Sequence, residues 1–224
     1  MNPPNLLDDQ GRASMATMVM MVHHAFRRDG ARFSKALDEI AQGNKSRIAP
    51  LAEEWKSFRM TLHGHHTQED SSVFPDVRNK HPETSKTIDT LTADHHRMDA
   101  LLERGDRALS ELPNDEAARV MTELRDLFNS HLALEEAEIV PFLRESREFP
   151  PIPDENAEKM FADGFAWCAQ GIARDVLDKV FAMVPPGVRD RLPAARDAFT
   201  QRCRRAWGTF EETASRTPVP ENLA

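Results

Sequence analysis

The chain carries one motif twice, as HHTQEDSSVFP at residues 65–75 and as HLALEEAEIVP at residues 131–141. Each copy reads histidine, three residues, glutamate, a second acid and, after two more residues, two apolar residues and a proline. The glutamate and the proline are six residues apart in both copies. This internal repeat predicts two similar helical hairpins, with each motif near the end of a hairpin's second helix.

Four long segments of helical period contain or flank the two motifs. We expect helices at about residues 14–41, 45–73, 83–112 and 115–144. Pro75 should end the second of these helices, and Asn114 or Asp115 should cap the fourth. Short connections between long helices favour antiparallel neighbours, so the sequence predicts an all-α fold, an up-down-up-down four-helix bundle.

The proline-rich stretch at residues 149–153 reads as a linker. We therefore predict a four-helix bundle over residues 1–148 and a helical extension over residues 149–224. The extension should contain shorter helices near 155–169, 172–183 and 188–213. It carries none of the expected metal ligands. Its apolar residues at helical spacing should pack on the bundle or on each other, or form a surface for a homodimer or another protein partner.

Composition narrows the class of protein. The formal net charge of -8 argues against nucleic acid as a partner. The sequence contains no run of about 18 apolar residues, so no membrane span is predicted. Its first residues do not resemble a signal peptide. Two distant cysteines, Cys168 and Cys203, fit a reducing compartment, so a cytoplasmic location is expected. The absence of tyrosine and of any Glu-x-x-His pair excludes tyrosyl-radical and ferritin-like di-iron bundles.

Histidines gather on all four predicted helices of the bundle, and acids follow three of these clusters at a spacing of four residues. On a helix, residues four apart differ by only about 40° in direction, so both side chains reach one point beside the helix. Imidazole and carboxylate together suit iron, manganese or zinc. A carboxylate also bridges two ions, so the pattern predicts a metal site that could be dinuclear.

Helical phase separates neighbouring histidines on two of the helices. His23 lies closer than His24 to the centre of the apolar face of residues 14–41, so His24 is expected to point to solvent. His95 is likewise closer than His96 to the apolar face of its helix. We therefore expect His23 and His95 to point into the bundle.

On the second helix, phase leaves two histidines open. His65 and His66 both lie near the apolar face, and acids follow both at four residues, as Glu69 and Asp70. We prefer His65 because the repeat aligns it with His131, and we assign His66 to the rim of the site.

On the fourth helix, His131 and Glu135 lie near the middle of the apolar face, with Glu138 as a rival acid. Carboxylates on faces made otherwise of Leu, Phe, Val and Ile would cost several kcal/mol if left uncompensated, and a metal ion removes that penalty. The predicted metal ligands are therefore His23, His65, Glu69, His95, Asp99, His131 and Glu135.

With these motifs the sequence resembles the hemerythrin family in its bacterial cation-binding (HHE) form, over roughly residues 15–145. The motifs that carry the resemblance are His23 with Phe26 and Arg27, the two repeated stretches, and Asp94-His95 followed by Asp99. The extension, with Phe165-Ala166-Trp167 and Val184-Pro185-Pro186, is similar to a tail found on many actinobacterial members.

The resemblance implies two non-haem iron ions bridged by an oxo or hydroxo group and by two carboxylates. Glu69 and Glu135 match the bridging positions, and the histidines of the predicted set match terminal ligands. Oxygen carriers of the family have a histidine where this chain has Asp99. Their last acid follows the final histidine by five residues instead of four. These departures predict a site poorer in histidine and argue against reversible oxygen carriage.

Two classes of function follow from the resemblance. The first is a protein that binds or senses O2, NO or peroxide, for example in oxidative or nitrosative stress. The second is an enzyme that disproportionates hydrogen peroxide at the two irons. Iron storage and a purely structural zinc or manganese site are further alternatives. We favour binding because no general base stands out apart from the ligands themselves.

Overall fold

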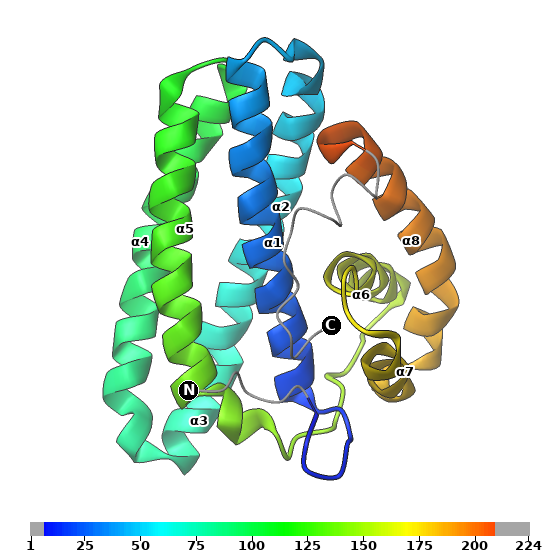
Figure 1. The fold of residues 1–224 in the computed structure, drawn as a ribbon. Coiled ribbons are helices and arrows are strands. Elements are labelled where there is room, and N and C mark those ends of the chain that lie inside the picture. The colour runs from blue at the N-terminus through cyan, green and yellow to red at the C-terminus, as the bar shows by residue number, and fades with distance from the viewer. Residues whose placement is uncertain (1–6, 209–224) are drawn as a thin grey trace. The chain divides into compact units, whose positions relative to one another are not determined.

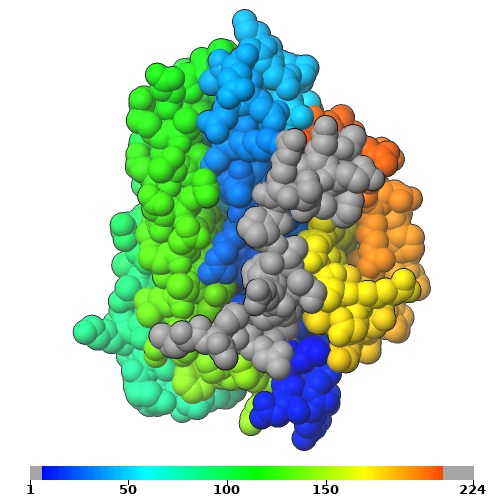
Figure 2. All heavy atoms as spheres, in the orientation of Figure 1, coloured from blue at the N-terminus to red at the C-terminus, as the bar shows by residue number. Residues whose placement is uncertain are grey.

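The computed structural model describes residues 7–208, which are drawn in colour in Figures 1 and 2. These residues form helices joined by turns and loops and contain no strand. The predicted all-α fold is therefore confirmed. The described residues form two compact units: the bundle unit, residues 26–139 and 205–207, and the extension unit, residues 7–25, 140–204 and 208. The borders between these units do not coincide with the predicted domain boundary between residues 148 and 149, and that boundary stays a prediction.

The bundle unit is built from long helices joined by short connections (Figure 1). Its elements are the second part of α1 (Met15–Ala41), then α2 (Ile48–Gln68), α3 (Phe74–Lys80), α4 (Ser85–Ser110) and α5 (Asp115–Glu138). α1 is one continuous helix, and its residues before Phe26 belong to the extension unit. The predicted helical bundle is confirmed.

The start of α5 shows which of two caps the sequence uses. The Asn114 side chain accepts a hydrogen bond from the Ala117 amide at 3.0 Å and donates one to the Ala108 carbonyl at 2.6 Å. The first bond satisfies an amide that has no partner within the helix. The second ties the cap to the end of α4, so a single side chain sets the turn between the two helices.

The second helix of the bundle does not end at Pro75, and that expectation was wrong. A π-helical turn, Glu69–Val73, joins α2 to α3, and the Phe74 amide bonds the Glu69 carbonyl five residues back. Pro75 then lies in the first turn of α3, where a missing N–H costs nothing. Phe74 and Val77 of α3 are buried.

Aromatic rings fill the middle of the bundle unit. Phe26 of α1 lies 5.6 Å from Phe58 of α2 and 5.8 Å from Phe128 of α5, between ring centroids. Phe33, two helical turns further along α1, packs edge-on against Trp55, with centroids 5.7 Å apart. This cluster lies next to the histidines, because Phe26 also contacts the His65 ring at 5.4 Å.

The Trp55 ring lies so close to α4 that only a glycine fits at position 105 of that helix. A Cβ added to Gly105 would overlap the Trp55 ring, and that ring is held by its Nε1, which donates to Asp106 Oδ1 at 2.9 Å. We expect Gly105→Ala to lower the free energy of unfolding by roughly 1–3 kcal/mol, the usual cost of overpacking. Gly64→Ala is the control, because nothing lies within 4 Å of its added Cβ, and it should stabilise the helix by roughly 0.5–1 kcal/mol. Urea unfolding measures both; equal stability of the two variants would contradict the expected clash.

The extension unit contains α6 (Glu155–Cys168), α7 (Arg174–Met183) and α8 (Pro186–Trp207) up to Arg204. These helices lie near the predicted ranges, except that α8 begins at Pro186, because proline is well suited to a first helical turn. Residues 209–213 of the third range lie outside the described part. The rings of Phe149, Phe161, Phe165 and Phe181 form a chain with neighbouring centroids 5.2–6.1 Å apart. The unit therefore has an aromatic cluster of its own, in which Phe165 is buried and the other three rings are half-buried.

Among the described residues, no helix combines the length and the apolar character that crossing a membrane requires.

Candidate metal centre

Three helical segments of the bundle unit bring histidines and glutamates to one place. α2 and the π-turn supply His65, His66 and Glu69, and α4 supplies His95. α5 supplies His131 and Glu135. All except His65 are buried, and the His65 side chain is only 12 % exposed.

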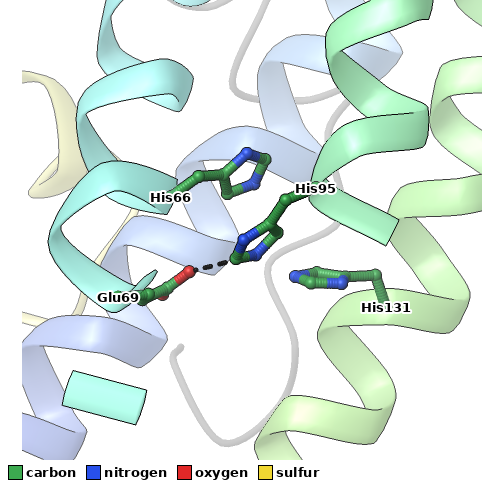
Figure 3. A group of neighbouring side chains, drawn as sticks. All are labelled: His66, Glu69, His95 and His131. Atoms are coloured by element: carbon green, nitrogen blue, oxygen red, sulfur yellow. Dashed lines mark ion pairs between the residues drawn. The ribbon is translucent and has the colours of Figure 1, made fainter. Parts of the chain in front are cut away.

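The first group consists of His66, Glu69, His95 and His131, and each residue offers a donor atom within 4.8 Å of those of the others (Figure 3). The His95 ring is stacked on the His66 ring, with centroids 3.9 Å apart, and lies 4.9 Å from the His131 ring. Phe74 lies parallel to His95 at 5.6 Å. The imidazoles thus pack against one another, and Phe74, the residue directly after the π-turn, packs against one of them.

The second group shares Glu69 with the first. Donor atoms of His65, Glu69 and Glu135 also lie within 4.8 Å of one another. Glu69 Oε1 lies 2.9 Å from His65 Nε2, whereas Glu69 Oε2 lies 3.4 Å from His95 Nε2. One buried carboxylate therefore presents one oxygen to each group.

Helix geometry explains why Glu69 serves both groups. At about 100° per residue, His66 points about 100° away from His65, and Glu69 falls about 40° from His65 and about 60° from His66. The carboxylate therefore lies between the directions of the two neighbouring imidazoles. Adjacent histidines on one helix are placed in different groups, and the glutamate one turn later joins them.

Two carboxylates act on His95 from opposite ends of its ring. Asp70 Oδ2 lies 3.0 Å from His95 Nδ1, and Glu69 faces Nε2. Burial alone lowers the pKa of His95, but the hydrogen bonds and negative charges of Glu69 and Asp70 outweigh it, so the pKa is raised above its ordinary value. The surroundings of this imidazole thus favour a positive charge, which a proton or a metal ion supplies.

The chemistry of the donor set fits the metal that the sequence implies. Imidazole nitrogens and carboxylate oxygens suit iron, manganese and zinc, and these groups contain no thiolate. Glu69 and Glu135 are 3 % and 1 % exposed, so two anionic side chains lie in the interior of the bundle. A buried negative charge needs a nearby cation, and the imidazoles surround the place where a cation would bind.

Most of the predicted ligands are brought together. His65, Glu69, His95, His131 and Glu135 all belong to the two groups. His66, which was assigned to the rim, joins the first group, so the choice between His65 and His66 resolves into one histidine for each group. Glu138, the rival acid on the fourth helix, is exposed.

Asp99 is not brought to the centre. It is exposed on α4 and belongs to neither group, because the buried face of α4, with Leu91, Met98 and Leu102, lies on the other side of His95, and the step of about 40° to Asp99 leads toward solvent. The expectation of a histidine-poor site rested on Asp99. The first group instead contains three imidazoles, and His66 from α2 supplies the third.

The two histidines of α1 are both buried. His23 is fully buried, as expected, and lies one turn before Phe26 on the same helix. His24 was expected to point to solvent, and that was wrong, because its side chain is 4 % exposed. Residues 15–26 of α1 are buried or half-buried on every side, so helical phase does not distinguish a solvent face there.

Comparison with protein families matches residues 14–143 to the hemerythrin HHE cation-binding domain. This match covers more than half of the chain, and the chain therefore belongs to the hemerythrin HHE cation-binding family. Comparisons with curated proteins and with solved structures found no match. The family resemblance expected from the sequence is thus confirmed, and the buried histidine and glutamate groups agree with a domain that binds cations.

Proposed function

We propose that this protein holds two non-haem iron ions in its helical bundle and uses them to bind O2 or a related small molecule, NO or peroxide. The observation that carries the proposal is Glu69, whose two carboxylate oxygens face imidazoles of two different groups. A carboxylate placed in this way is suited to bridge two ions. His66, His95 and His131 would hold one ion, His65 and Glu135 the other, and Glu69 both.

His23 is the remaining ligand in this proposal. It precedes Phe26 by three residues on one uninterrupted helix, so the two side chains share a face of α1. Phe26 contacts the His65 ring at 5.4 Å between centroids. A fully buried imidazole on the same face is well suited to complete the group of His65 and Glu135.

The surroundings of the groups favour binding over catalysis. When bound, the iron pair would supply a redox-active centre with affinity for O2 and similar ligands. Beside the ligands, Arg27 binds both oxygens of Glu136, at 2.5 and 3.2 Å, and Asp70 is engaged with His95. The two acids that directly follow Glu69 and Glu135 thus hold other side chains in place, and this does not favour a role in proton transfer.

A reducing compartment such as the cytoplasm fits the proposal. Cys168 and Cys203 are buried in the extension unit, and two cysteines so far apart in the sequence do not make a disulfide framework. A role of that unit as a surface for a second copy or another protein remains a prediction.

Metal content and peroxide turnover test the proposed function together. Native protein should contain about two iron ions per chain, and its reduced form should change its optical spectrum when O2 or NO is added. One ion per chain, or zinc in protein prepared without added zinc, would contradict the proposal, and many ions per chain would indicate iron storage. Steady oxygen evolution from peroxide, beyond that of the same amount of free iron, would favour the enzymatic alternative, in which two H2O2 give two H2O and one O2.

A further inference from the structure

The second acid of the repeated motif has a different partner in each copy. Asp70 and Glu136 occupy equivalent positions, directly after Glu69 and Glu135. Asp70 contacts a proposed metal ligand, His95, whereas Glu136 binds Arg27. We infer that Asp70 is a positioning residue that makes the two metal positions unequal, so that the position of His66, His95 and His131 fills first. The inference rests on the proposed function for the presence of two ions.

Asp70 holds His95 in the orientation that metal binding requires. One carboxylate oxygen, Oδ2, lies 3.0 Å from His95 Nδ1, and the other accepts a hydrogen bond from Thr92 Oγ1 at 3.2 Å. Thr92 lies one turn before His95 on α4, so both oxygens of Asp70 contact the same helix. With its Nδ1–H donated to Asp70, His95 has the lone pair of Nε2 left for a metal, and Nε2 is the atom that faces Glu69.

A second carboxylate lies behind another ligand of the same position. Asp94 Oδ2 is 3.8 Å from His131 Nδ1, and Asp94 is nearly buried. Its other oxygen accepts a hydrogen bond from Arg97 at 2.7 Å. Negative charge behind a ligating imidazole raises its basicity and strengthens its bond to a cation. Asp94 shares its charge with Arg97 and lies beyond hydrogen-bond distance of His131, so Asp70, which contacts His95 directly, is the stronger outer partner at this position.

The other position has a neutralised acid at the equivalent place. Both Glu136 oxygens are bound by the Arg27 guanidinium, a bidentate pair whose charges cancel. The ring that contacts His65 from α1 is Phe26, which carries no charge. Both copies of the repeat thus carry the proposed metal-binding glutamate, but the acid that follows it contacts a proposed ligand in one copy and an arginine in the other.

Stepwise metal binding by two matched variants tests the inference. Asp70→Asn and Glu136→Gln each replace one carboxylate by an amide of the same size, at equivalent positions of the repeat. Metal-free wild type and variants would be titrated with Zn²⁺, a redox-inert probe. Loss of an outer partner of a metal-bound histidine typically costs 10–100-fold in affinity, so we expect the tighter step to weaken by roughly that factor in Asp70→Asn and to be unchanged in Glu136→Gln.

Nitrogen NMR of the imidazoles in Zn²⁺-loaded protein supplies a readout that altered stability alone would not move. Wild type should show His95 bound through Nε2, with a hydrogen-bonded Nδ1–H whose resonance shifts or disappears in Asp70→Asn. If both variants bind two Zn²⁺ with wild-type affinities, or weaken the same step equally, the inference is overturned while the two-metal proposal stands. If wild type itself binds only one Zn²⁺, the proposed function fails, and the inference fails with it.

Discussion

A chain carrying Glu69→Gln should lose both metal ions, whereas Glu135→Gln should lose mainly one. Glu69 is the acid that the two groups share, with one oxygen 2.9 Å from His65 and the other 3.4 Å from His95. An amide keeps the shape of the side chain but removes the negative charge and one oxygen donor. We therefore expect wild type to retain about two ions per chain after dialysis, and the Glu69 variant to retain almost none.

The control for this experiment is Glu138→Gln, which alters an exposed acid on α5 three residues after Glu135. It should keep the full metal content. Metal analysis of dialysed protein and circular dichroism would be measured on all variants, so that unfolding is separated from loss of ligands. A Glu69 variant that keeps one tightly bound ion would show that Glu69 serves only one position, and the shared-carboxylate proposal would be wrong.

Trp207→Ala should destabilise the bundle strongly without touching a metal ligand. Trp207 belongs to the bundle unit although it lies at the end of α8, and its ring is 5 % exposed. It packs edge-on against Phe33, with centroids 5.0 Å apart, and Arg47 binds the neighbouring Ala206 carbonyl at 3.2 Å. Truncation of a buried tryptophan typically costs roughly 3–5 kcal/mol, and we expect a loss of that size in urea unfolding.

Met60→Ala is the matched control, because Met60 is a large apolar residue of the bundle that is 72 % exposed. It should change the free energy of unfolding by less than about 0.5 kcal/mol. A chain that ends at residue 148 lacks Trp207 and should be destabilised at least as much as Trp207→Ala, while it keeps every proposed ligand. Wild-type stability of either protein would show that Trp207 is not a part of the bundle core.

Much of the fold could be predicted because helical period and chain-breaking residues are local properties. The start of α5 follows from its capping residue, Asn114, and the extent of α1 from apolar spacing, and both signals act within a few positions of the chain. The His-x-x-x-Glu spacing likewise places His65 beside Glu69 and His131 beside Glu135 by helix geometry alone. The helix end predicted at Pro75 was wrong because the π-turn before this residue shifts the hydrogen-bond register of the helix.

The repeated motif, read along the chain, therefore predicted the helices and the chemistry of the site: imidazoles and carboxylates on buried faces. The tertiary structure decided which of these side chains belong to which of the two groups. Phase along one helix cannot show that His65 and His66 join different groups, or that Asp99 falls outside both, because these depend on where α4 and α5 place their own residues. The same holds for the pairing of Asp70 with His95 and of Glu136 with Arg27. Each pairing joins side chains from separate helices, and packing between helices selects which of the available partners comes within reach.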